Sequence, residues 1–107
     1  MLLIREVMYC KPGKVRPLVE KFLRMAELGE RKGWGKMRVM TDVSAERYWT
    51  LVAEMEVASM EEFMKMGPSG DPEEQKEFAA IMEGYHDLVE SGRREIYNLE
   101  GSGDRNS

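Results

Sequence analysis

The sequence has few of the residues on which small proteins build reactive centres. It contains one cysteine, Cys10, and one histidine, His86. A single cysteine excludes an internal disulfide and is typical of a reducing compartment, so we expect a cytoplasmic protein. The sequence has no pair such as His-x-x-x-His or Cys-x-x-Cys, which is the spacing that metal ligands usually show. We therefore expect no bound metal.

Long hydrophobic runs and an excess of positive charge are also missing. The longest apolar run, Met1-Leu2-Leu3-Ile4, is far shorter than the ~20 residues that cross a membrane. Arg5 and Glu6 follow it without the small-residue cleavage site of a signal peptide. Lys and Arg number 16 against 20 Asp and Glu, which gives a net charge of −4. We expect neither a membrane anchor nor a nucleic-acid partner, because phosphates require clustered positive charge.

The first half of the chain shows strand and helix patterns in turn. A strand is expected over 2–10, and it ends at the turn signal Lys11-Pro12-Gly13-Lys14. Apolar residues at three-and-four spacing then predict a helix that begins close to Val15, because Pro17 is tolerated only in a first turn. Gly33 is a natural end for this helix. Two more strands are expected after it, over 36–41 and 48–57, joined by a hairpin loop over 42–47.

The second half predicts a helix in two pieces and one further strand. Ser59, with Glu62 three residues later, forms a capping-box pattern that begins a short helix. The breaker Gly67-Pro68-Ser69-Gly70 ends it. Asp71 then caps a second helix, with Pro72 at its first position. We expect the rest of the chain to continue as helix to Ser91-Gly92, as a strand over 93–99 and as a disordered tail over 101–107.

This order of elements, β-α-β-β-α-β with a split second helix, predicts an α+β fold of the ferredoxin-like type. An antiparallel sheet would carry both helices on one face, in a single domain over residues 1–100. The first strand, however, has apolar side chains on both faces, namely Leu2, Ile4 and Met8 on one and Leu3, Val7 and Tyr9 on the other. Because helices cover only one face, we expect a homodimer that packs sheet against sheet.

Several segments also carry a resemblance to a known family. They are Arg5-Glu6-Val7-Met8-Tyr9 with Lys11-Pro12-Gly13-Lys14, Val39-Met40-Thr41-Asp42, Leu51-Val52-Ala53-Glu54-Met55-Glu56-Val57, Ser59-Met60-Glu61-Glu62-Phe63 and Arg94-Glu95-Ile96-Tyr97. Together they resemble the dimeric α/β-barrel superfamily, most of all its small NIPSNAP-like bacterial members. The resemblance covers about residues 1–99 and implies a dimeric α/β barrel. Because the superfamily includes cofactor-free monooxygenases, small isomerases and haem-handling enzymes, the resemblance specifies fold far better than function.

The resemblance makes haem a question, because haem-degrading members of the superfamily use a helix histidine as the iron ligand. His86 lies on the flank of the expected last helix. Those members also carry an asparagine on the first strand and a tryptophan near the end of the third, where this chain has Glu6 and Val57. We therefore expect no haem and no other cofactor.

Polar side chains on the predicted strands are the candidates for a site. If the apolar face of the third strand packs on the helices, Tyr48 and Glu54 point to the opposite face. Arg5 and Tyr9 share a face of the first strand. In the ferredoxin-like order the third strand lies between the first and the second, so Arg5 and Arg38 are expected to flank Glu54. Two interpretations stay open, a salt-bridge network that closes the dimer and an acid–base set in an apolar cleft.

The leading functional hypothesis is binding, or turnover without a cofactor, of a small and largely apolar metabolite in a cleft between helices and sheet. In that case Arg5 steadies negative charge and Glu54 or His86 is the base. Ten methionines suit an adaptable cavity as well as a core. The predicted ligand-binding residues are Arg5, Tyr9, Arg38 and Tyr48. The alternative is a non-catalytic homodimeric module with a closed barrel, and whether the protein is an enzyme stays open.

Overall fold

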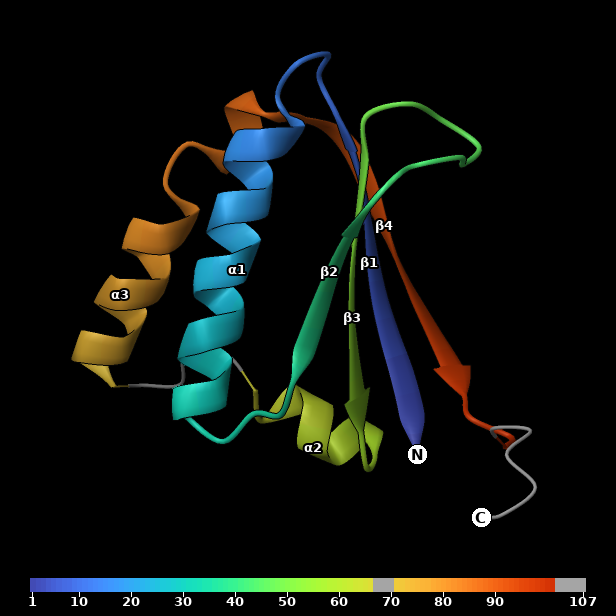
Figure 1. Ribbon diagram of the computed structural model, residues 1–107. Coiled ribbons are helices and arrows are strands. Elements are labelled where there is room, and N and C mark those ends of the chain that lie inside the picture. Colours follow the sequence, from blue (N-terminus) through green and yellow to red (C-terminus); the bar gives the residue numbers. More distant parts are fainter. Residues whose placement is uncertain (67–70, 102–107) are drawn as a thin grey trace.

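The computed structural model describes residues 1–66 and 71–101, which form a four-stranded antiparallel sheet with helices on one face (Figure 1). The spatial order of the strands is β2-β3-β1-β4, so β3 lies between β1 and β2. The strands are β1 (Leu2–Cys10), β2 (Met37–Thr41), β3 (Thr50–Val57) and β4 (Val89–Asn98). The helices are α1 (Val15–Arg31), α2 (Met60–Met64), α3 (Pro72–Met82) and the 3₁₀ turn η1 (Tyr85–Asp87). The predicted ferredoxin-like fold is confirmed, and the sheet of the single chain is open.

Helix α1 lies across the middle of the sheet and forms the core with it (Figure 1). It begins at Val15, as predicted, so that Pro17 falls in its first turn. It ends at Arg31, and the chain then turns at Gly33 in the left-handed conformation with φ +76°. The buried core cluster consists of Leu18, Val19 and Phe22 of α1, Leu51 and Ala53 of β3 and Cys10 of β1. The prediction that the apolar face of β3 packs on the helices is confirmed.

The pleat gives the sheet two faces, of which only one has helices on it (Figure 1). On the helix-covered face Ile4 of β1 and Leu51 of β3 are almost inaccessible to solvent. On the opposite face, which we call the open face, Val7 of β1 is also only 3% exposed. Val7 lies there between its cross-strand partners Val52 and Arg93. The first strand therefore buries apolar side chains on both of its faces, as its sequence predicts.

The caps of the two short helices form as predicted. The Ser59 hydroxyl accepts a hydrogen bond of 3.2 Å from the backbone N–H of Glu62, and the Asp71 carboxylate accepts one of 3.0 Å from the N–H of Glu73. Both bonds satisfy donors that the first turn of a helix leaves free. The breaker expected at 67–70 and the tail expected at 101–107, except for Gly101, lie outside the described residues.

The boundary between the last helix and the last strand differs from the prediction. Helix α3 ends at Met82, and β4 begins at Val89 rather than at residue 93. Gly84, with φ +79°, adopts a left-handed conformation that stops the helix. Tyr85 and Leu88 still pack on the core, but they do so from η1 and the turn after it. The helical spacing of these apolar residues thus reflects shared burial, not a continuous helix.

The start of β3 also differs from the prediction. The strand begins at Thr50, because Trp49 has φ +61° and so interrupts the alternation of side chains. Two hydrogen bonds fix this turn, a bond of 2.9 Å from the Thr50 N–H to the Asp42 carboxylate and one of 2.8 Å from the Cys10 N–H to the Trp49 carbonyl. Tyr48 therefore belongs to the loop before β3, where it is 87% exposed.

Among the helices of residues 1–66 and 71–101, none combines the length and the apolar character that crossing a membrane requires.

We expect Gly84→Ala to destabilise the protein by about 1–2 kcal/mol, because a side chain costs that much in the left-handed conformation. Gly101→Ala is the control, since Gly101 has no positive φ and no atom within 4 Å of an added Cβ. Urea denaturation of both variants measures the difference. Equal stabilities would contradict the role of Gly84 in ending α3.

Candidate functional site

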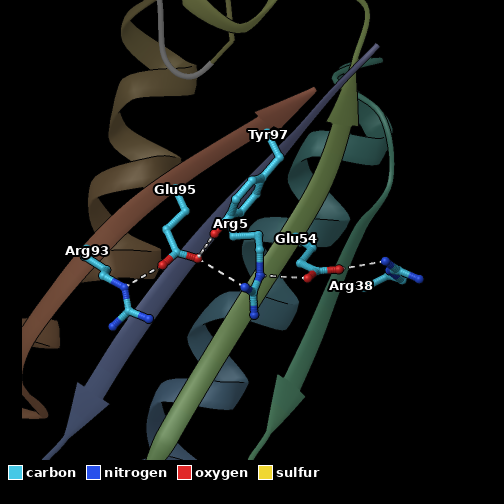
Figure 2. Close-up of polar contacts among 6 residues, drawn as sticks. All are labelled: Arg5, Arg38, Glu54, Arg93, Glu95 and Tyr97. Atoms are coloured by element: carbon cyan, nitrogen blue, oxygen red, sulfur yellow. Dashed lines mark hydrogen bonds and ion pairs between the residues drawn. The ribbon is translucent and has the colours of Figure 1, made fainter. Parts of the chain in front are cut away.

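A row of alternating charges crosses all four strands on the open face (Figure 2). The row consists of Arg38 of β2, Glu54 of β3, Arg5 of β1 and Glu95 of β4, and each is the cross-strand partner of the next. Glu54 lies 2.7 Å from Arg38 Nη2 and 2.9 Å from Arg5 Nε. Arg5 Nη1 is in turn 3.1 Å from Glu95. The prediction that Arg5 and Arg38 flank Glu54 is confirmed as geometry.

Two further residues of β4, Arg93 and Tyr97, contact Glu95. Arg93 Nε lies 2.7 Å from Glu95, and the Tyr97 hydroxyl donates a hydrogen bond of 3.1 Å to the same carboxylate. The hydrogen bond from Arg93, helped by that from Tyr97, lowers the pKa of Glu95. Arg93 also donates to the Tyr9 hydroxyl, and both of its bonds raise the pKa of the guanidinium. We call Arg38, Glu54, Arg5, Glu95, Arg93, Tyr97 and Tyr9 the open-face network.

The open-face network holds its central arginine between two carboxylates. Arg5 Nε is inaccessible to solvent and contacts Glu54, while Nη1 contacts Glu95. The side chain of Glu54 is only 13% exposed. Arg5 therefore has two negative partners within the chain. This is the geometry of a salt-bridge network rather than of a site that binds an external anion.

Two predicted site residues lie away from the open-face network. Tyr48 is in the loop before β3, where it lines a surface hollow with Trp49 and Asp42. His86 is exposed in η1, beyond the end of α3, and its ring lies 4.0 Å from that of Tyr85. No contact joins His86 to Glu54 within the described part of the chain. The two alternative bases, Glu54 and His86, therefore lie on separate elements, β3 and η1.

The largest cavity lies on the other side of the sheet, between the strands and the helices. Its volume is about 570 Å³, within the range of pockets that hold small molecules. Seven of the ten methionines line it, namely Met8, Met25, Met37, Met55, Met64, Met66 and Met82. The lining also includes aromatic side chains, among them Phe22, Phe63, Phe78 and Trp34. We call this space the methionine cavity.

One charged pair interrupts the apolar lining of the methionine cavity. Glu6 of β1 and Arg94 of β4 are cross-strand partners, and both line the cavity. Arg94 Nε donates a hydrogen bond to Glu6, and its guanidinium carbon lies 5.0 Å from the centre of the Phe63 ring. Sequence reasoning missed this pair. Its signal was present, because Glu6 stands between Ile4 and Met8 on the apolar side of the first strand.

The open face has only a smaller hollow. It measures about 220 Å³ and is lined by Arg38 and Glu54 with Leu3, but not by Arg5 or Tyr9. A pocket beside Arg5, Tyr9 and Glu54 would have favoured a binding site there. The methionine cavity on the helix-covered face is therefore the larger of the two spaces.

Neither a metal cluster nor a reactive thiol is evident in residues 1–66 and 71–101. No group of three His, Cys, Asp or Glu side chains converges among these residues. Burial, with a smaller contribution from the negative charge of Asp42, raises the pKa of the Cys10 thiol. A raised pKa favours the unreactive thiol over the thiolate, so Cys10 acts as a small buried core residue.

Comparison with solved structures identifies the class of fold. A NIPSNAP family protein from Agrobacterium tumefaciens matches with a TM-score of 0.72 at 14% identity, over 97% of this chain and 98% of that one. A NIPSNAP domain protein from Burkholderia xenovorans gives a TM-score of 0.67 at 14% identity, over 92% and 94%. A candidate antibiotic biosynthesis monooxygenase from Deinococcus radiodurans gives 0.67 at 8% identity, over 97% of both chains.

The chain therefore has the ferredoxin-like fold that these NIPSNAP proteins share, and the resemblance seen in the sequence is confirmed at the level of fold. No protein-family profile and no curated protein matches the sequence.

We expect Glu54→Gln to cost about 2–3 kcal/mol of stability. The value lies between the ~1 kcal/mol of exposed pairs and the ~3–5 kcal/mol lost when a buried pair is broken, because the side chain of Glu54 is 13% exposed and that of Arg38 is 66% exposed. Glu56→Gln, on the same strand but exposed, removes the same charge and is the control. Chemical denaturation at one fixed protein concentration measures both, and equal losses would show that the open-face network contributes nothing.

Proposed function

We propose that the protein binds a small, largely apolar molecule in the methionine cavity. The observation that carries this proposal is the 570 Å³ space lined by seven methionines. Methionine side chains are flexible and polarisable, so a surface rich in them adapts to the shape of an apolar guest.

The arrangement of the helices explains why this space exists. Helix α3 packs mainly against α1, not against the sheet (Figure 1). Two ion pairs, Arg31 with Glu77 and Lys32 with Glu74, tie α3 to the end of α1. Lys21 of α1 also donates to the carbonyl of Glu83 just after α3, at 2.6 Å. These contacts hold α3 at a distance from the strands, so flexible side chains line the gap.

The proposal includes a homodimer formed through the open face, in a reducing compartment such as the cytoplasm. Tyr97 is 48% exposed and Met40 38% exposed on this face, and no described helix covers them. The open-face network supports such an interface, because its arginines and carboxylates pair within the chain and so enter a contact already neutralised. The same network also supports the rival function, a homodimeric module that binds no ligand.

Turnover is not part of the proposal. The acid–base roles of Glu54 and His86 stay predictions, and so do the ligand-binding roles of Arg5, Tyr9, Arg38 and Tyr48. The side chain of Glu54 contacts Arg5 and Arg38 on the open face, and His86 is exposed in η1. The observations on the methionine cavity bear on binding alone.

We expect 1-decanol, at ten times its dissociation constant, to raise the melting temperature by roughly 6–11 °C. Binding to the folded state alone contributes ~1.4 kcal/mol at that concentration, and each kcal/mol shifts a domain of this size by about 4–8 °C. Met25→Trp, which fills the cavity from α1, should abolish the shift. Leu23→Trp is the control, since Leu23 is 50% exposed on the same helix. If neither decanol nor a panel of apolar alcohols and aromatics raises the melting temperature, the result favours the rival function, a homodimeric module that binds no ligand.

We expect light scattering to give the mass of a dimer at micromolar concentration. Tyr97→Lys should yield a folded monomer, because it replaces an aromatic ring of the interface with a charged side chain that loses its water on association. Tyr48→Lys makes the same exchange at an exposed loop position and should leave the dimer intact. A well-folded monomer of the unaltered protein would contradict the homodimer.

A further inference from the structure

We propose that the ligand of the methionine cavity is an amphipathic monocarboxylate, with an apolar body among the methionines and its carboxylate on Arg94. The inference rests on the proposed function and narrows it to one chemical class. It is drawn from Glu6 and Arg94, which line the cavity and pair with each other. The other charged lining residue, Glu54, has its carboxylate on Arg5 and Arg38 of the open face.

Arg94 is placed and oriented by three separate elements. Its position on β4 puts it directly opposite Glu6 of β1. Its Nε donates to the Glu6 carboxylate. Phe63 of α2 holds the guanidinium from a third side, with the guanidinium carbon 5.0 Å from the ring centre, a distance typical of a cation–π contact. An arginine held in this way loses little side-chain freedom when it binds a ligand.

Beside the methionine cavity, Arg94 keeps two nitrogen atoms of its guanidinium without a partner in the described part of the chain. Its Nη1 and Nη2 atoms have no hydrogen bond or ion pair to any residue within 1–66 and 71–101, and the side chain is 55% exposed. Arg5, by contrast, contacts two carboxylates, and Arg93 contacts Glu95 and Tyr9. The paired N–H groups of a guanidinium match the two oxygens of a carboxylate. Arg94 is thus equipped to receive one carboxylate at the edge of an apolar space.

Glu6 determines which anion fits. Its carboxylate remains beside Arg94 and offsets part of the positive charge. A ligand with a single negative charge completes a group of one cation and two anions, whereas a phosphate dianion adds a second charge that Glu6 repels. A neutral molecule makes no ion pair with Arg94, whose free donors stay in contact with water, and so gains nothing from the charge. The pair therefore favours a monoanion over both alternatives.

Three probes with the same alkyl chain test the chemical class of the ligand. They are decanoate, 1-decanol and decyl phosphate, each used below its critical micelle concentration. Fluorescence of Trp34, which lines the cavity, reports binding, and calorimetry confirms the dissociation constants. We expect decanoate to bind about tenfold or more tightly than decanol, as a hydrogen-bonded ion pair adds to the same apolar contact. Decyl phosphate should bind more weakly than decanoate.

Substitutions of Glu6 and Arg94 test whether this pair causes the preference for decanoate. Arg94→Met should abolish the difference between the affinities for decanoate and for decanol, because it removes the partner of the carboxylate. Arg93→Met removes the neighbouring arginine, which points to the open face, and should change neither. Because Arg94→Met leaves Glu6 charged and alone, the double variant Glu6→Gln with Arg94→Met keeps the test valid if the single one fails to fold. Glu6→Gln alone should strengthen decyl phosphate binding severalfold.

The outcomes separate the two proposals. If no probe binds, the proposed function fails and this inference fails with it. If decanol binds as tightly as decanoate, or if the preference for decanoate survives Arg94→Met, the cavity binds apolar molecules but the carboxylate class is wrong. If decyl phosphate binds more tightly than decanoate to the unaltered protein, Glu6 does not select a monoanion and the inference is overturned.

Discussion

The packing of α1 across the centre of the sheet is the contact on which the rest of the structure depends. Leu18, Val19 and Phe22 cover Leu51 and Ala53 and exclude solvent from the middle of the helix-covered face. Helix α3 then packs mainly against α1, and the space between α3 and the strands is not filled. The methionine cavity is thus a consequence of where the first helix packs, and the side chains that line it are flexible ones.

The sheet has apolar side chains on both faces, and the two faces shield them from water in different ways. The helix-covered face is apolar and carries one charged pair, Glu6 with Arg94. The open face carries a row of charges in which every carboxylate lies between arginines (Figure 2). Beneath that row Val7 is nearly inaccessible to solvent. Paired charges can enter an interface at lower cost than single ones, which makes this face suitable for a second copy.

The two arginines next to each other on β4 show how the pleat separates these roles. Arg93 points to the open face, where it contacts Glu95 and Tyr9. Arg94 points to the opposite face, where it lies beside Glu6 and Phe63. Adjacent residues of a strand alternate in direction, so two identical side chains have entirely different surroundings. A shift of one residue in the pairing of β1 and β4 would exchange them.

Local sequence patterns determined the order of elements and the caps at Ser59 and Asp71, because caps and strand alternation depend on neighbours a few residues apart. They predicted the grouping of Arg5, Glu54 and Arg38 only together with the ferredoxin-like order of strands. They did not determine that Gly84 ends α3 or that Trp49 turns the chain before β3, since apolar spacing continues through both places. They predicted a cleft between helices and sheet that methionines could line, but neither its place nor its size, and they left the pair Glu6–Arg94 unseen. A cavity depends on the distance at which one element holds another, and only tertiary packing decides that distance.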